Sequence, residues 1–491
     1  MRALFFLLLA SAFAQDDDDD DREELDSLKS LGYMADFSAT PGGAQDIGYF
    51  RDRVGAGEIP HPNVFTPEGL FGEHDLPITG SGGCQALLCP VTAAVPARLM
   101  VQPEVGWLAQ VGFDTNIDPA TFHRAPLNLV AVVDKSGSMA GDPLETVKAS
   151  LKAVLEQMGP EDQLSIVLYG DVVEVRLPPT RASEKATIRK VIDGVQSAGS
   201  TDMESGLRQG YSLAMATAKP FRGTTRVMLF TDERPNVGAT DAASFMGMAR
   251  TASEAGVGLT TIGVGVQFGA ELASAVSSVR GGNLYFFADV PDMRARFADE
   301  FDFLVTELAY DLELTVKAAP GLRVTGIYGV PGDLVTYTPE GDLRLTVETL
   351  FLSKQEGAIY VSFGQDGALP FAGGPLGTVG ARYETREGKG GAAMEVRVTD
   401  RPELGLVRGV KLVDEATVLR EATALHHEKN DQEGAFQLVH ALAGSQAGDT
   451  DPELANERAL VAKLEESLAK LSGHQGEPRT ASRDRVNGLP R

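Results

Sequence analysis

The middle of the chain alternates between short apolar runs of strand length and longer stretches with the period of a helix. The apolar runs occupy 127–134, 165–169, 226–232, 259–264 and 283–287. Between them, apolar residues recur at every third or fourth position, as on the buried face of a helix, after Pro143, around Ile188, around Leu272 and over 291–308. This alternation predicts a doubly wound α/β unit with a mostly parallel sheet. The turn Gly170-Asp171 predicts one antiparallel edge strand.

The sequence on both sides of this unit alternates apolar and polar residues with period two, which is the pattern of half-buried strands. It does so over 97–126 and again over 309–400, with Gly and Pro turns between the runs. Short strands at such spacing favour a β-sandwich. We expect the strands of 97–126 to pair with those of 309–400, so that the α/β unit of 127–308 is inserted between strands of the sandwich.

Helical periodicity returns near the C-terminus, and short helices are predicted before the first strands. Apolar residues share one face over 410–472, whereas the polar stretch 473–491 favours a disordered tail. Over 46–96 the pattern indicates two short helices around a proline turn, followed by a loop with the only cysteines, Cys84 and Cys89. We expect these to form a disulfide in an exported protein. A thiolate metal site would need further ligands, and only His74 lies close by in sequence.

The first residues, 1–14, have the pattern of a signal peptide, with a short buried helix as the alternative. Met1-Arg2 precedes an apolar core that ends in an Ala-x-Ala pattern and is too short to span a bilayer. Residues 15–45 follow with six consecutive acids at 16–21, which favours a disordered spacer over a calcium-attracting tail. No later stretch is long and apolar enough to cross a membrane. We therefore expect a protein that is secreted or held in the periplasm or cell envelope.

The charge balance narrows the class of partner. The 69 acidic and 44 basic residues give a formal net charge of −25. Such a surface repels nucleic acid and anionic membranes, while it lowers the cost of holding cations nearby. We therefore expect no nucleic-acid partner. The sequence does not indicate an oligomeric state.

Oxygen-bearing side chains gather where predicted strands meet loops. Asp134, Ser136 and Ser138 alternate after an apolar strand, and residues two apart in extended chain point the same way. Thr201 lies in a loop between helical patterns, and Asp232 ends a second apolar strand. Carboxyl ends of parallel strands meet at one edge of a sheet, where ligands bind. Helix capping is the alternative role for the two acids, but the five oxygens together predict a site for Mg²⁺ or Mn²⁺, with Ca²⁺ as a further option.

With these residues placed, the stretch 127–308 resembles the von Willebrand factor A domain and its metal-ion-dependent adhesion site. The resemblance implies that Ser136, Ser138 and Thr201 contribute hydroxyl groups to the ion, while Asp134 and Asp232 act directly or through water. In this family the ion keeps one coordination position for an Asp or Glu side chain of a protein partner. The function implied by the resemblance is therefore adhesion.

A wider resemblance rests on 47–71, which contains a tyrosine-bearing helical pattern, a proline turn and an acidic-aromatic stretch. This segment is similar to the one before the central domain in bacterial exported A-domain proteins that are catalogued as calcium-activated chloride channel homologues. The acidic-aromatic stretch matches only in part. Since no spanning segment is predicted, we expect no channel.

Two other functions compete with adhesion: a structural envelope scaffold with an unused ion site, and a metal-assisted hydrolase. A hydrolase needs a positioned general base, and Glu233, where the A-domain family more often has Gly, is the only candidate near the predicted ion. The chain has no Gly-x-Ser-x-Gly, His-Glu-x-x-His or Walker motif. His426, His427 and His440 are favoured as solvated or helix-end residues, because adjacent helical positions diverge by about 100°. We expect a binding protein and no enzyme.

Overall fold

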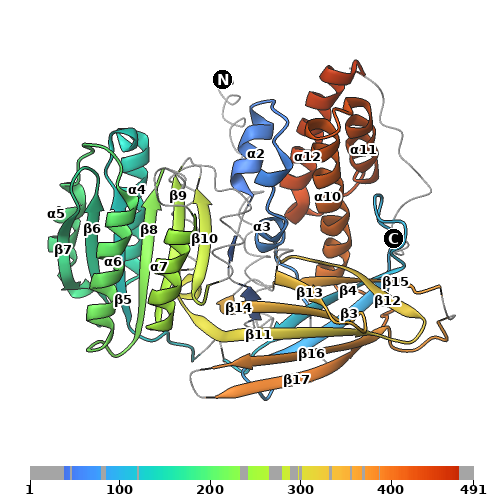
Figure 1. Cartoon of the computed structure of the whole chain (residues 1–491), viewed down its shortest axis with the longest axis horizontal. Helices are drawn as coiled ribbons and strands as arrows, with labels where there is room; N and C mark the ends of the chain where they lie inside the picture. Colours follow the sequence, from blue (N-terminus) through green and yellow to red (C-terminus); the bar gives the residue numbers. More distant parts are fainter. Residues whose placement is uncertain are drawn as a thin grey trace, which may run out of the picture.

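The computed structural model describes residues 38–474, with gaps at 42, 45–46, 79–83, 119–120, 233–241, 265–278, 288–296, 298–300, 331–333, 354–356, 368–370 and 386–387. It contains two sheets and a group of helices (Figure 1). The predicted fold class is confirmed: a mostly parallel, doubly wound sheet stands beside an antiparallel platform and C-terminal helices. The predicted signal peptide of 1–14, the acids at 16–21 and the tail from 475 onward lie outside the described residues.

The first sheet has seven strands in the order β2-β10-β9-β8-β5-β6-β7. Their bounds are β2 Gly43–Ala44, β5 Leu127–Asp134, β6 Gln163–Tyr169, β7 Glu174–Arg181, β8 Thr224–Thr231, β9 Val257–Val264 and β10 Gly282–Phe287. Every neighbouring pair is parallel except β6 and β7, so the predicted antiparallel edge strand is confirmed. Strand β5 is buried along its whole length because helices cover both of its faces.

Helices pack on both faces of this sheet. Residues at odd positions of β5 share an apolar core with α4 (Asp142–Gln157) and α5 (Lys185–Asp193). Residues at even positions share a second core with α6 (Met203–Ala218) and α7 (Ala242–Glu254). This division follows from the period of two along a strand, which sends successive side chains to opposite faces.

The second sheet has ten strands and is antiparallel. Its strands are β1 Ser38–Pro41, β3 Cys89–Pro96, β4 Trp107–Asp114, β11 Glu307–Ala318, β12 Leu322–Tyr328, β13 Val335–Tyr337, β14 Leu343–Ser353, β15 Ile359–Gln365, β16 Gly377–Glu384 and β17 Lys389–Val396. Strand β4 pairs with β15, which confirms that strands before the α/β unit pair with strands after it. The sheet doubles over one apolar core. The Ala94 N–H donates to the Arg397 carbonyl, and the Thr399 N–H donates to the Ala94 carbonyl, which joins β3 to the chain beyond β17.

Three boundaries differ from the sequence-based expectation. Residues 38–41 lie in one sheet and residues 43–44 in the other, rather than in a disordered spacer, because β1 pairs with β14 and β2 pairs with β10. Residues 89–96 form strand β3 rather than part of a helical segment. The helix expected over 291–308 has ended by Val305, since a turn at Thr306 leads into β11, whose first residue is Glu307.

The remaining helices form one unit from two distant parts of the sequence. They are α2 Gly48–Gly55, α3 Pro67–Gly72, α10 Leu404–His427, α11 Gln432–Ser445 and α12 Ala455–Ser472, with short 3₁₀ turns at Pro62–Val64 and Pro452–Leu454. Their apolar residues share a single core with part of the platform sheet. The Tyr360 hydroxyl of β15 donates a hydrogen bond to the Gly405 carbonyl, 2.7 Å away, which seats α10 on the sheet. Figure 1 shows α2 and α3 beside α10 and α12.

Two smaller expectations concern the cysteines and the membrane. Cys84 and Cys89 are joined in a disulfide, as predicted. Among the helices in the described part of the chain, none combines the length and the apolar character needed to cross a bilayer.

Candidate metal centre

The predicted metal ligands lie at the carboxyl edge of the seven-stranded sheet. Asp134 is the last residue of β5, and Asp232 directly follows β8. These two strands are parallel neighbours, so their ends meet at the same edge. Ser136 and Ser138 follow β5: Ser136 precedes a 3₁₀ turn, Gly137–Met139, and Ser138 lies within it. This turn leads the chain toward α4. The fold therefore brings four of the five predicted residues together.

Short oxygen-to-oxygen distances connect these four side chains. The hydroxyl oxygens of Ser136 and Ser138 are 3.0 Å apart, and the Ser138 hydroxyl donates to Asp232 Oδ1 at 3.2 Å. One oxygen of Asp134 accepts the Ser136 backbone N–H at 2.8 Å, and the other accepts the Thr231 hydroxyl at 3.4 Å. The side chain of Asp134 is 0% exposed. A fully buried carboxylate is thus surrounded by neutral donors.

Thr201 approaches this edge on a loop that backbone hydrogen bonds fix. The Gly137 N–H donates to the Gly199 carbonyl at 3.0 Å, and the Ala198 N–H donates to the Lys135 carbonyl at 2.6 Å. The loop therefore lies beside the turn that carries the serines. Asp202, the next residue, caps helix α6 by accepting the Ser205 N–H at 3.0 Å. Thr201 is half-buried between these two fixed points.

One residue that positions this loop was not predicted. Oδ1 of Asp171 accepts both the backbone N–H and the hydroxyl of Ser200, at 2.7 and 2.6 Å. These bonds lower the pKa of Asp171, with the Ser200 hydroxyl as the largest cause. In the sequence, Gly170-Asp171 indicates only a turn between strands. The second role depends on a contact across 29 residues, which no local pattern reveals.

The residues present fit a small, hard divalent cation. Adjacent ligands of an octahedral Mg²⁺ ion, each about 2.1 Å from it, lie about 3.0 Å apart. The two distances at Ser138, 3.0 and 3.2 Å, are close to this value. Among the described residues Asp134 makes no ion pair, so its buried charge lacks a cationic partner there. The donor set is entirely oxygen, which suits Mg²⁺ or Mn²⁺.

Two groups of predicted residues are not part of this site. Glu233, the candidate general base, lies outside the described residues. The C-terminal histidines are far from the sheet edge: His440 pairs with Glu465 at 2.7 Å, and His427 contacts the Ile59 carbonyl at 2.8 Å. His426 and His427 lie in the last turn of α10, as predicted, whereas His440 is largely buried within α11, which differs from the prediction.

Comparison with known proteins agrees with this description. The model of the von Willebrand factor type A domain matches residues 128–298. The uncharacterized protein YfbK of Escherichia coli is 30% identical over 197 residues, which cover 39% of this chain and 34% of that protein. The protein sll0103 of Synechocystis is 27% identical over 197 residues, 40% of this chain and 46% of that protein. The matches thus span a third to a half of these relatives.

Among solved structures, a von Willebrand factor type A protein from Catenulispora acidiphila covers 81% of this chain and 89% of its own, with 14% identity and a TM-score of 0.47. The similarity to proteins catalogued as calcium-activated chloride channel homologues is not supported by these comparisons. Domains of this type often bind a divalent metal at a metal-ion-dependent adhesion site. Residues 128–298 of this chain form a von Willebrand factor type A domain.

Proposed function

We propose that the A domain binds a protein partner through a divalent cation held by Asp134, Ser136, Ser138, Thr201 and Asp232. The observation that carries this proposal is the state of Asp134, a fully buried carboxylate that is surrounded by hydroxyl and amide donors. Burial of a charge without a cation is costly. A divalent ion at this sheet edge would compensate that charge and explain why two serine hydroxyls point to the same place.

The donor set also determines what the ion would recognise. Two carboxylates and neutral hydroxyls leave a dication electron-poor, and the edge of the sheet keeps one side of it accessible. An Asp or Glu side chain of a partner would complete the coordination shell. The net charge of −25 lowers the cost of holding the ion but repels acidic partners at a distance. We therefore propose recognition of one carboxylate at close range rather than of an acidic surface.

Calorimetric titration of Mg²⁺, Mn²⁺ and Ca²⁺ into the chelator-treated chain tests the ion site. We expect one saturable site for Mg²⁺ or Mn²⁺ that is lost in the Asp232→Ala variant. Circular dichroism of the variant checks that the domain still folds. An unchanged isotherm in Asp232→Ala would contradict the proposal.

Carboxylate recognition is tested by selecting displayed random peptides on the immobilised chain in Mg²⁺ and eluting them with chelator. We expect enrichment of peptides with an Asp or Glu at one fixed position. The Asp232→Ala chain serves as the control surface. Equal enrichment on both surfaces, or no acidic preference, would mean that the ion site does not contact the partner.

We also propose that this role is one of binding rather than catalysis, and that it is carried out outside the cytoplasm. The signal-peptide pattern of residues 1–14 supports export. The disulfide between Cys84 and Cys89 supports it independently, since such bonds persist in oxidising compartments. N-terminal sequencing of the protein recovered from cell fractions tests this proposal: a start at residue 15 in a non-cytoplasmic fraction is expected.

A further inference from the structure

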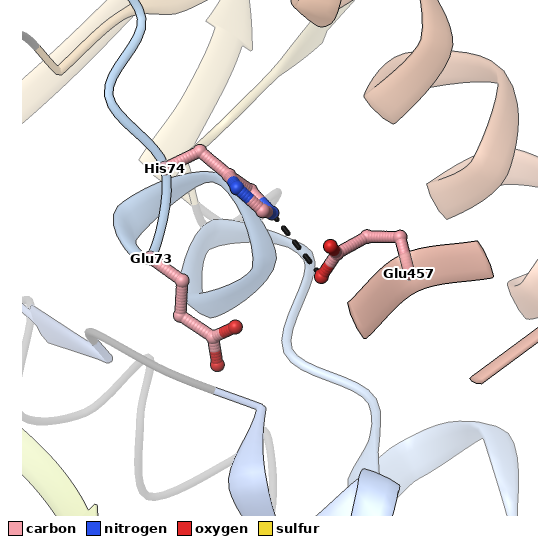
Figure 2. Close-up of side chains that lie close together, drawn as sticks. All are labelled: Glu73, His74 and Glu457. Atoms are coloured by element: carbon pink, nitrogen blue, oxygen red, sulfur yellow. Dashed lines mark ion pairs between the residues drawn. The ribbon is translucent and has the colours of Figure 1, made fainter. Parts of the chain in front are cut away.

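A second cluster of titratable side chains lies far from the A domain, between the N-terminal and C-terminal helices. Glu73 and His74 follow α3, and Glu457 lies in the first turn of α12. One potential ligand atom from each residue lies within 4.8 Å of the other two. Figure 2 shows the His74 ring and the Glu457 carboxylate facing each other, with Glu73 beside them. Among the described residues this is the group of histidine and carboxylate side chains that approaches metal-binding geometry.

Polar atoms in this cluster are buried without hydrogen-bond partners. His74 is 5% exposed and Glu457 is 1% exposed. Nε2 of His74 lies 3.2 Å from Oε1 of Glu457, but neither ring nitrogen makes a hydrogen bond within the described structure. Oε2 of Glu457 also has no hydrogen-bond partner there. Such orphaned atoms are costly in a protein interior. A single cation between the ring and the carboxylates would satisfy Nε2 of His74 and Oε2 of Glu457 together.

The charges of the cluster leave room for a dication. Arg51 forms ion pairs with both Glu73 and Glu457. Glu453 adds a third carboxylate, 3.7 Å from Nδ1 of His74. With His74 uncharged, three carboxylates and one guanidinium leave a formal charge of −2.

We propose that His74, Glu457 and Glu73 form a second divalent-metal site, for a cation such as Zn²⁺ that accepts imidazole nitrogen together with carboxylate oxygen. Mg²⁺ and Ca²⁺ prefer all-oxygen sites, so the imidazole separates this site from the one in the A domain. Tetrahedral Zn²⁺ places its ligands about 2.0–2.1 Å from the ion, and rotation of the Glu73 side chain, which is 15% exposed, would close the set. The ion would join chain segments about 400 residues apart.

The site is independent of the proposed adhesion function, and the experiment keeps the two apart. The test uses the full chain with Asp232→Ala, which disables the A-domain site. It also carries His427→Gln, because His427 packs near His61 and His426 on the surface and such rings take up Zn²⁺ on their own. Equilibrium dialysis against Zn²⁺ should then show one bound ion per chain.

Adding His74→Gln to this background should weaken Zn²⁺ binding at least 100-fold. His440→Gln is the matched control, since His440 is a largely buried histidine of the same helical unit that already pairs with Glu465. It should leave the binding unchanged. Equal binding in the His74→Gln chain, or no ion bound to the background chain, would mean that the cluster is an ion-pair network in which a proton on His74 takes the place of the metal.

A second measurement does not depend on the folding of the His74→Gln chain. Zinc-edge X-ray absorption of the background chain should show one imidazole and oxygen ligands. Two or more imidazoles, or none, would overturn the proposal. Glu73→Gln, at the most exposed of the three positions, should weaken Zn²⁺ binding about tenfold without loss of the imidazole signal.

Discussion

At the edge of the seven-stranded sheet, Asp134 is buried among hydroxyl and amide donors, whereas between α3 and α12 Glu457 is buried against the guanidinium of Arg51. Both carboxylates are almost inaccessible to solvent. Asp134 has no cationic side chain beside it among the described residues. Binding of a cation from solution would therefore stabilise its charge. Glu457 is paired with a cationic side chain of the same chain, so this ion pair contributes to tertiary structure. Substitutions at the two places should therefore have opposite effects on stability.

The largest effect is expected at Arg51. Arg51→Met removes the only guanidinium that pairs with Glu73 and Glu457 in the described structure, and leaves their charges uncompensated. Breaking a buried ion pair from one side costs about 3–5 kcal/mol of unfolding free energy. Urea unfolding followed by far-ultraviolet circular dichroism measures the loss. Arg53→Met is the matched control, because Arg53 pairs with Glu58 near the surface of the same helix and should be neutral. Equal effects of the two substitutions would contradict the buried-pair assignment.

The stability of the protein is expected to depend on pH through Glu415 in α10, which is also a buried carboxyl group. Burial, and next the charge of Glu457, raise the pKa of Glu415 to about 8, against the effects of Gln446 and Arg51. The unfolded value is about 4.3, so between these values the folded state holds a proton that the unfolded state releases. Stability is thus full at low pH and is lost as pH rises through 8.

Glu415→Gln removes this linkage while keeping an acceptor for the Gln446 amide, which donates to Glu415 at 2.8 Å. At about 1.4 kcal/mol per pKa unit, the parent should lose about 2–4 kcal/mol relative to the Glu415→Gln chain between pH 5 and pH 8. Asp414, whose pKa burial raises to about 6, is present in both chains and cancels in the difference. Parallel curves of unfolding free energy against pH would show that Glu415 stays ionised in the folded protein.

At Asp134, in contrast to Arg51, we expect a substitution that does not destabilise the protein when no metal is bound. Asp134→Asn removes a buried charge that lacks a cationic side chain while keeping an acceptor for the Ser136 N–H. In chelator, the variant should be at least as stable as the parent, because the cost of burying the charge is gone. In Mg²⁺, the parent should gain stability by mass action and the variant should not. Thermal melts with and without Mg²⁺ measure both, and a variant destabilised in chelator would mean that Asp134 acts as a structural cap.

The difference between the two clusters also explains which of them the sequence could predict. The ligands of the A-domain site follow two parallel strands whose apolar runs are visible in the sequence, so their meeting point follows from the fold class. Arg51 and Glu457 are 406 residues apart, on helices whose packing depends on the complete tertiary structure. No periodicity connects them. Local patterns therefore predict a site built on strand ends but not one built between distant helices.

The same reasoning applies to the connection between the two sheets. The six acids at 16–21 predict a spacer over 15–45, and residues 38–44 fall within that range. In the structure β1 pairs with β14 in the platform, and β2 pairs with β10 at the edge of the A domain. The conformation of this segment is determined by backbone hydrogen bonds to the edges of strands that already exist. Its side-chain pattern therefore does not predict these pairings.

The smallest effect, a loss of Mg²⁺ affinity, is expected at Asp171. Its contact with Ser200 positions the A-domain site, and the sequence does not reveal this contact. Asp171→Ala removes both hydrogen bonds to Ser200 and so loosens the loop that carries Thr201. Loss of a group that orients a metal ligand typically weakens binding 10- to 100-fold. We expect the low end for Mg²⁺, about tenfold, because the backbone bonds of Gly137 and Ala198 still hold the loop.

Ser200→Ala provides the graded control for this prediction. It removes the hydroxyl bond at 2.6 Å but keeps the backbone N–H bond at 2.7 Å, so its effect on Mg²⁺ binding should lie between those of the parent and Asp171→Ala. Global stability should be unchanged in both variants, since both residues are exposed. If calorimetry gives the same Mg²⁺ affinity for all three chains, the backbone bonds alone position Thr201. In that case the site would be preorganised by main-chain contacts, as the cluster between the helices is by its ion pairs.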